Sequence, residues 1–293
     1  MKKITVAMLF QLACLVAFSQ SDINQIRKEF DSLLKTTTYG KNDAVGKYYD
    51  IRGFKMYCET YGEGAPLLII HGNSGSIDNF AKQIPYFSQK YKVIIADSRA
   101  QGKSADAGDS LTYEMMADDY AALLTAMKVD SAFVIGWSDG GINGLLLAIR
   151  HPEKVRKLAV TGANLRPDTT AVYPEVINMV KPSYNMVKNK KTPLTEEEKT
   201  GFKLLKLLLE QPNIPVADLH RIAVPTLVIG GDHDVIKEEH TMEIYKHIAK
   251  AYLWILPASG HATPIVYTDA FNTTVDHFFA TPYKKIQGGG RFF

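Results

Sequence analysis

A serine, a histidine and two aspartates are spaced along this chain in a way that could support nucleophilic catalysis. Ser138 lies at the centre of the stretch Gly136-Trp-Ser-Asp-Gly140. A serine hydroxyl is a weak nucleophile at neutral pH, so it needs a base, and the base needs an acid that orients it. His261, in a loop after a later strand, is the predicted base. Asp232 and Asp234 are both candidates for the acid, and spacing alone does not separate them.

The segments around Ser138 predict how it is presented. An apolar run over residues 132–135 predicts a buried strand, and residues from about 140 to 149 predict a helix. The turn between them is a nucleophile elbow, in which a Cβ atom at either flanking glycine would collide. The turn also places the N–H of Asp139 at a helix N-terminus, where partial positive charge stabilises an oxyanion.

A second oxyanion donor is expected from the loop after another strand. Residues 66–70 are all apolar and are followed by His71-Gly-Asn73, so the N–H of Asn73 is the predicted donor. His71 itself has two interpretations, direct catalysis and a packing or hydrogen-bonding role, and we favour the second. A metal site at His233 with its two aspartate neighbours is not expected, because nearly consecutive residues converge poorly on one ion. No cofactor is predicted.

Short apolar strands alternate with amphipathic helices over most of the chain. The predicted strands are 66–70, 91–96, 132–135, 155–161, 225–230 and 251–256. The predicted helices between them are 77–89, 113–128, 140–149 and 238–249, and a β-hairpin over 48–51 and 54–61 precedes them all. This pattern predicts an α/β fold, a mostly parallel sheet with helices on both faces, in which functional residues gather at the carboxyl ends of the strands.

Residues 163–221 interrupt this alternation. They hold two helical stretches, 172–187 and 196–210, and follow the carboxyl end of a strand, so they predict a small helical cap over the site. Four large side chains either line a pocket or hold the cap together, and we favour the second for each taken singly: Met179, Tyr184, Met186 and Phe202.

The first 19 residues predict a secretory signal peptide. Lys2 and Lys3 form a basic start, and the apolar run over residues 4–18 is too short to span a bilayer comfortably. Small residues at 17 and 19 match a cleavage site, so we expect a mature chain that begins near Gln20 and is periplasmic or extracellular. The alternatives are an uncleaved membrane anchor and lipidation of Cys14, whose preceding residues match a lipobox poorly.

Charge and cysteine count limit the partners of the mature chain. The formal net charge of +3 falls to +1 without Lys2 and Lys3, because residues 1–19 hold no acid. Nucleic acid is therefore not an expected partner, and neither is stable membrane insertion after processing. Without Cys14 only Cys58 remains, so the thiol is expected in the core. The expected partner is a small ester-like molecule, and the oligomeric state is not predicted.

These features divide the 293 residues into six segments. They are a signal peptide (1–19), a helical extension (20–45), a first core part (46–162), the cap (163–221), a second core part (222–282) and a flexible tail (283–293). The extension holds an amphipathic helix over residues 22–36, and its role does not follow from the sequence.

Five motifs together resemble the α/β-hydrolase superfamily over roughly residues 46–282. They are His71-Gly-Asn, Asp97-x-Arg-x-x-Gly-x-Ser104, Gly136-Trp-Ser-Asp-Gly-Gly141, Gly231-Asp-His-Asp234 and Gly260-His261. The order Ser, Asp, His is the one expected for this elbow. In that superfamily the acid is the fourth residue of a Gly-x-x-Asp turn, so the resemblance selects Asp234.

Two stretches are also similar to valacyclovirase and the biphenyl hydrolase-like proteins, which hydrolyse esters of α-amino acids: residues 136–141 and Thr161-Gly-Ala-Asn164. In that family the aspartate after the nucleophile binds the ammonium group of the substrate, which implies this role for Asp139. The cap differs in length, and Asp97-Ser-Arg-Ala departs from the usual Arg-Gly dipeptide. Alternatively, an acid in the first turn of a helix stabilises it by about 0.3 to 1 kcal/mol.

The expected reaction is hydrolysis of a small ester, thioester or lactone through an acyl-enzyme on Ser138. A serine at the elbow argues against haloalkane dehalogenase and epoxide hydrolase chemistry. A carbon–carbon bond hydrolase and a cofactor-free perhydrolase are alternatives on the same fold. A slow-turnover ligand-binding module is an alternative from another class, because a fold does not determine a function.

Overall fold

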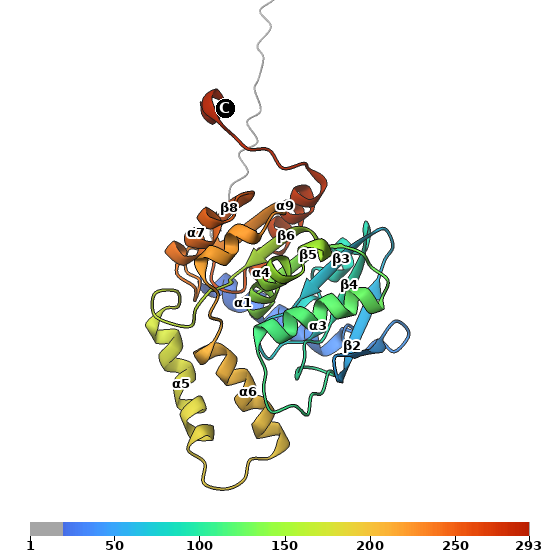
Figure 1. Ribbon diagram of the computed structural model, residues 1–293, viewed down its shortest axis with the longest axis vertical. Helices are drawn as coiled ribbons and strands as arrows, with labels where there is room; N and C mark the ends of the chain where they lie inside the picture. Colours follow the sequence, from blue (N-terminus) through green and yellow to red (C-terminus); the bar gives the residue numbers. More distant parts are fainter. Residues whose placement is uncertain (1–19, 293) are drawn as a thin grey trace, which may run out of the picture.

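An eight-stranded sheet forms the centre of the computed structural model, which describes residues 20–292 (Figure 1). The predicted signal peptide lies outside these residues. The strands follow the spatial order β1-β2-β4-β3-β5-β6-β7-β8. Their bounds are β1 Lys47–Ile51, β2 Phe54–Tyr61, β3 Ala65–Ile70, β4 Tyr91–Ala96, β5 Ala132–Trp137, β6 Val155–Thr161, β7 Thr226–Gly231 and β8 Ala251–Leu256.

The pairing of the strands confirms the predicted α/β fold. β1 pairs antiparallel with β2, and β2 pairs antiparallel with β4. All other neighbouring pairs run parallel. Parallel strands are joined by helices that cross over a face of the sheet, and this covers both faces. The central strands are therefore continuous apolar runs, and residues 67–70 of β3 are fully buried.

Two hydrophobic clusters lie on the two faces of the sheet. One packs under α3 (Tyr113–Ala126), α4 (Asp139–Arg150) and α7 (Glu238–His247). The other packs under α2 (Ile84–Phe87) and α9 (Thr268–Ala280). Cys58, the cysteine expected in the core, is buried in the first cluster.

The single helix predicted over residues 77–89 is wrong. The segment forms a 3₁₀-helix, Ile77–Phe80, and a separate single-turn helix, α2. Pro85 explains the break, because proline has no N–H to donate to the carbonyl four residues earlier and its ring collides with that turn. The apolar spacing still places the same side chains inward, since the four residues Ile77, Phe80, Ile84 and Phe87 are all buried.

Two helices near the C-terminus were not predicted: α8 (Thr263–Val266) and α9. The signal for α9 was present, because Phe271, Val275, Phe278 and Phe279 recur at helical spacing and are all buried. The remaining short elements are 3₁₀-helices at Pro152–Lys154, Val216–Arg221 and Gly288–Phe292. The last of these lies in the expected flexible tail, which leads away from the body in Figure 1. No helix among residues 20–292 is long and apolar enough to cross a membrane.

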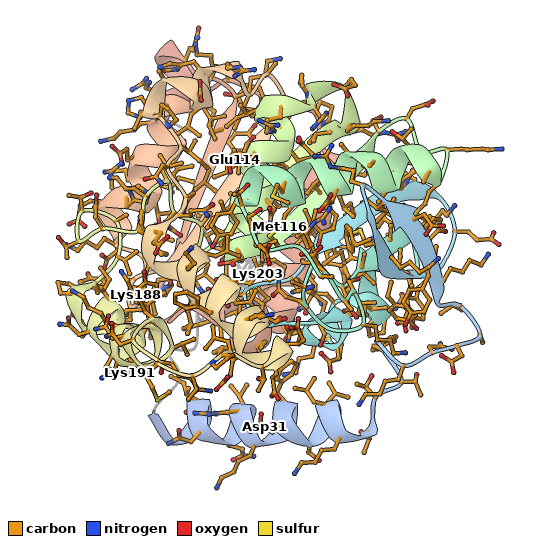
Figure 2. All side chains as sticks on the ribbon, turned by 60° about the horizontal axis from the view of Figure 1, so that its bottom comes forward. Asp31, Glu114, Met116, Lys188, Lys191 and Lys203 are labelled. Atoms are coloured by element: carbon orange, nitrogen blue, oxygen red, sulfur yellow. The ribbon has the colours of Figure 1, made fainter. Side chains whose placement is uncertain are left out.

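Two helices between β6 and β7, α5 (Pro174–Lys188) and α6 (Glu196–Glu210), project together at the bottom of Figure 1. Helix α6 begins with a capping box, in which Thr195 and Glu198 each bind the backbone N–H of the other. Lys203 of α6, labelled in Figure 2, fixes this helix to the core. Its ammonium group donates to the carbonyl of Gly108 (2.6 Å) and pairs with Asp106 (3.2 Å).

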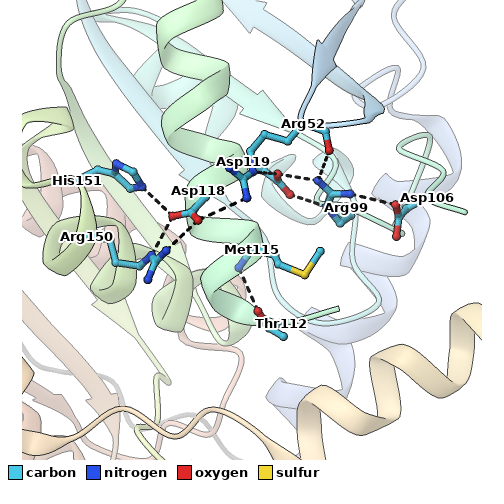
Figure 3. A network of polar contacts seen from close by, with 9 residues as sticks. All are labelled: Arg52, Arg99, Asp106, Thr112, Met115, Asp118, Asp119, Arg150 and His151. Atoms are coloured by element: carbon cyan, nitrogen blue, oxygen red, sulfur yellow. Dashed lines mark hydrogen bonds and ion pairs between the residues drawn. The ribbon is translucent and has the colours of Figure 1, made fainter. Parts of the chain in front are cut away.

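The motif residue Arg99 holds the loop after β4 (Figure 3). Its buried guanidinium donates two hydrogen bonds to Asp119 of α3 (2.7 and 2.8 Å) and one to Asp106 (3.0 Å). A bidentate pair of this kind is geometrically specific. Since Lys203 also binds Asp106, the loop after β4 links the core to α6.

Candidate active site

Ser138 lies on a sharp turn between β5 and α4, with φ 58° and ψ −123°. This is a left-handed conformation that non-glycine residues seldom adopt, and such strain collects at functional sites. A Cβ at Gly136 would lie 2.2 Å from the carbonyl oxygen of Gly140, and one at Gly140 would lie 2.0 Å from that of Ile70. Both glycines are therefore required for the turn that presents the hydroxyl.

The structure brings Ser138, His261 and Asp234 together in one hydrogen-bonded chain. The Ser138 hydroxyl lies 2.8 Å from Nε2 of His261, and Nδ1 of His261 lies 2.6 Å from Oδ1 of Asp234. The indole N–H of Trp137 donates to the backbone carbonyl of His261 (2.7 Å) and fixes its loop. In this arrangement Nδ1 carries the proton and Nε2 is free to accept the proton of Ser138.

Asp234, and not Asp232, contacts His261. Asp234 is 3% exposed and also accepts a hydrogen bond from the N–H of Ile236 (3.2 Å). Asp232 instead accepts from Nδ1 of His233 (2.8 Å) and from the N–H of Ser259 (3.1 Å). Asp232 therefore shapes the two loops that carry the acid and the histidine.

The charge of Asp234 determines the electrostatics of the imidazole. Burial by itself would lower the pKa of His261, but the charge and the hydrogen bond of Asp234, with a smaller effect of Asp139, raise that pKa above its ordinary value. Asp234 thus stabilises the protonated form of His261. A general base needs this stabilisation because it must hold the proton that it accepts during the reaction.

Gly162 also belongs to the site, although no role was predicted for it. A Cβ at this position would lie 2.7 Å from Cε1 of His261. Glycine therefore leaves the space that the imidazole occupies. In the sequence, Gly162 stands out only as part of Thr161-Gly-Ala-Asn164, a stretch that shows a family resemblance and predicts no role at the site.

The loop after β3, which holds the predicted oxyanion donor, lies against Ser138. A Cβ at Gly72 would lie 3.0 Å from Cβ of Ser138. The next residue, Asn73, donates its side-chain amide to Asp139 (2.9 Å) and to the carbonyl of Leu204 on α6 (3.2 Å). The backbone N–H groups of Asn73 and Asp139 make no hydrogen bond to another group of the described chain.

His71 supports this loop. Its Nδ1 donates to the carbonyl of Gly72 (2.8 Å), and its Nε2 accepts from the N–H of Ser98 in the loop after β4 (2.9 Å). Burial lowers the pKa of His71 to about 4, so the ring is neutral at physiological pH. It therefore joins two loops, which agrees with the hydrogen-bonding interpretation.

A cavity of about 230 Å³ opens at Ser138 and His261, between the sheet and the cap. The cap lines it with apolar side chains spaced along one face of α5 and with two leucines of α6: Val176, Ile177, Val180, Leu208 and Leu209. Asp139, Tyr113, Asn164 and Gln211 contribute polar groups to its lining. An apolar cavity with a few convergent polar groups is typical of a small-molecule site.

The four large cap residues considered as pocket lining are absent from this cavity. Met179 and Met186 are 77% and 71% exposed, so they neither line the cavity nor hold the cap together. Tyr184 and Phe202 contact each other across the cap with ring centroids 5.3 Å apart. The aromatic pair therefore holds α5 against α6, and β-branched and leucine side chains line the cavity in their place.

Asp139 is 2% exposed and faces the same cavity. Burial raises the pKa of its carboxyl to about 6, against the opposing effects of hydrogen bonds from Asn73 and Tyr113 and of the nearby His261. It is therefore ionised at neutral pH. Within residues 20–292 no group of three His, Cys, Asp or Glu side chains is arranged to hold a metal ion.

Comparison with known proteins gives three kinds of similarity. The family model of the alpha/beta hydrolase fold matches residues 65–190. The human protein named Serine hydrolase BPHL is 26% identical over 249 residues, which cover 78% of this chain and 84% of that protein. The 2-hydroxymuconate semialdehyde hydrolase of Pseudomonas sp. is 25% identical over 266 residues, or 80% of this chain and 94% of that one.

Among solved structures, the enol-lactonase from Burkholderia xenovorans superposes with a TM-score of 0.68 at 23% identity. The match covers 80% of this chain and 100% of the lactonase. At this identity the likeness concerns the fold.

Proposed function

Because the chain is a hydrolase of the α/β-hydrolase superfamily, we propose that it cleaves small carboxylic esters through an acyl-enzyme on Ser138. The observation that carries the proposal is the continuous hydrogen-bonded chain from Ser138 through His261 to Asp234. Ser138 and His261 line an apolar cavity that is large enough for a small acyl group. A nucleophile, a base and an orienting acid in this order are what acyl transfer through a covalent intermediate requires.

The first half of the reaction transfers the acyl group to the serine. The Ser138 oxygen forms a bond with the carbonyl carbon while its proton moves to Nε2 of His261. The carbonyl oxygen becomes an oxyanion, which the N–H groups of Asn73 and Asp139 stabilise. The bond to the leaving oxygen then breaks, and His261 gives its proton to that oxygen, so the alcohol departs neutral.

The second half hydrolyses the acyl-enzyme. Water replaces the alcohol, and His261 removes a proton as the water oxygen bonds to the acyl carbon. The bond to Ser138 breaks and the serine recovers its proton from His261. Asp234 stays ionised throughout, holds the ring in the required tautomer and stabilises the imidazolium.

A substrate panel tests the reaction class. Purified protein of residues 20–293 would be assayed with acyl esters, aminoacyl esters, thioesters, lactones and peptides. Multiple-turnover release of p-nitrophenol from a short acyl ester is the expected result, and it separates an enzyme from a ligand-binding module. Turnover of a vinylogous 1,5-diketone with no ester cleavage would instead favour the carbon–carbon hydrolase alternative.

Asp139 carries a narrower proposal, a preference for substrates with a free α-ammonium group. The carboxylate leaves the chain directly after the nucleophile and faces the cavity. A hydrogen bond to a charged group contributes about 1.5 to 3 kcal/mol, or roughly 10- to 150-fold in discrimination. Asp139→Asn should lower kcat/KM for an aminoacyl ester by that factor. For the matching ester that lacks the amino group, kcat/KM should change by less than about threefold.

The pH dependence sharpens this test. Asp139 is ionised above its pKa of about 6, and an α-amino group stays protonated below about 7.7 to 8.0. The preference should therefore be strongest between these two values. Equal losses on both esters would contradict the ammonium proposal, because Asp139 also binds the side chain of Asn73 and would then act by positioning the oxyanion loop.

We also propose export of the protein, from the basic start and apolar run of residues 1–18. N-terminal sequencing of protein from the expressing cell should give a chain that starts near Gln20 in the periplasm or the medium. A chain that retains Met1 in the soluble cytosol would contradict export. Lipidation of Cys14 would appear as a mature chain that begins at that residue.

A further inference from the structure

A second cavity lies against His261, on the side of the N-terminal helix α1 (Gln20–Thr36). Its volume is about 470 Å³, within the range of roughly 300 to 1,000 Å³ typical of small-molecule sites. The loop after β8, helix α8 and α1 line it with mostly apolar groups, chiefly Ile23, Ala258, Ala262 and Val266. The imidazole of His233, paired with Asp232, lies at its edge.

Helix α1 is fixed in place beside this cavity. It packs against α8, and Phe30 anchors it with only 6% of its surface exposed. Just after the helix, the backbone N–H groups of Gly40 and Asn42 donate to the buried carboxylate of Glu59 (2.8 and 2.9 Å). Figure 2 shows α1, marked by Asp31, along one edge of the molecule, apart from the cap that carries Lys188 and Lys191.

His261 lines both cavities, so the two cavities meet at this residue. The cap cavity also holds Ser138 and Asp139, where the acyl carbon and the oxyanion form. The oxygen of the leaving group must lie within hydrogen-bond reach of Nε2 of His261, because that atom gives it a proton. A leaving group that extends from this oxygen past the ring meets the second cavity.

We propose that the second cavity binds the alcohol part of the ester, that this alcohol is an apolar alkyl or aryl group, and that Ile23 of α1 forms one wall of the subsite. The inference rests on the proposed ester hydrolysis. The lining includes no carboxylate, lysine or arginine. His233, its ionisable group besides His261, is already paired with Asp232, so the subsite favours an uncharged alcohol. The N-terminal helix then has a function in substrate selection.

The test uses two series of esters with the protein of residues 20–293. One series keeps acetate as the acyl group and lengthens the alcohol from methyl to hexyl. The other keeps methanol and lengthens the acyl group from acetate to hexanoate. Full burial of each added methylene raises kcat/KM by about fourfold at most.

Tryptophan at either wall should affect one series only. Ile23→Trp should lower the ratio of kcat/KM for the hexyl ester to that for the methyl ester by about tenfold or more. The ratio of kcat/KM for the hexanoate to that for the acetate in the acyl series should stay unchanged. Val176→Trp, which fills the cap cavity, should do the reverse. Ile23→Asp should also lower the alcohol ratio, because a carboxylate then faces the alkyl chain. Asn24→Trp, on the exposed side of α1, is the matched control and should change neither ratio.

The outcomes separate the two proposals. Turnover in which Ile23→Trp leaves the alcohol ratio unchanged, or changes both ratios equally, overturns the subsite and leaves the ester hydrolysis intact. A wild-type protein that cleaves neither series overturns both. The folded state of each variant is verified by circular dichroism and its Tm, so a loss of structure is not mistaken for a loss of binding.

Discussion

Ser138→Ala is expected to lower kcat for ester hydrolysis by roughly 10⁶-fold, the scale seen when a serine protease loses its nucleophile. Among residues 20–292, the Ser138 hydroxyl is the only group that forms a hydrogen bond with Nε2 of His261 (2.8 Å). Removing one oxygen deletes the atom that bonds to the acyl carbon. The measurement is steady-state release of p-nitrophenol from a short acyl ester.

The fold itself should survive this substitution. Alanine retains the Cβ, so the backbone at φ 58° is strained to the same degree as with serine. We expect an unchanged circular dichroism spectrum and a similar Tm. Full activity in Ser138→Ala would contradict the assignment of the nucleophile, whatever residue then performed the reaction.

Asp234→Asn is expected to lower kcat by about 10⁴-fold. If the amide NH₂ faces His261, it donates to Nδ1 and forces the proton onto Nε2, which can then no longer accept from Ser138. If the amide oxygen faces the ring, the NH₂ takes the place of Oδ2, which is buried and has no hydrogen-bond partner among the described residues. In both orientations the charge that stabilises the imidazolium is lost.

Asp232→Asn is the matched control, because it lies two residues away and does not contact His261. Its effect on kcat should be less than about tenfold. A second measurement separates catalysis from loop structure. Since Asp234 raises the pKa of His261, the ring should titrate at a lower pH in Asp234→Asn when followed by NMR. Equal losses of activity in both variants, with no change in titration, would leave the orienting acid unassigned.

Most of the sheet could be predicted because its strands are buried on both faces and read as short apolar runs. One error falls where a single residue changes the outcome. The apolar residues between positions 77 and 89 have helical spacing, but Pro85 divides the segment into two short helices. Hydrophobic spacing alone does not reveal that proline lacks the N–H a continuous helix needs. Helix α9 was overlooked although its phenylalanines repeat at helical spacing.

The candidate site was predictable where local chemistry determines it. Ser138, His261 and the two candidate aspartates follow strands whose carboxyl ends meet at one edge of the sheet. The choice of Asp234 over Asp232 comes only from the family resemblance, and the structure brings Asp234 within hydrogen-bond distance of His261. The cap lining was not predictable, because residue size does not tell which side of α5 faces the sheet. The space that Gly162 leaves for the imidazole depends on a contact between residues 99 positions apart, Gly162 and His261.

The acyl-enzyme is the central claim, and its direct detection is the most decisive measurement. Wild-type protein would be mixed with p-nitrophenyl acetate, quenched in acid within milliseconds and analysed by mass spectrometry of the intact chain and its peptides. We predict one acetyl group per chain, located on Ser138, and none in Ser138→Ala treated in the same way. Turnover with no covalent adduct, or with the acetyl group on another residue such as Cys58, would contradict the account.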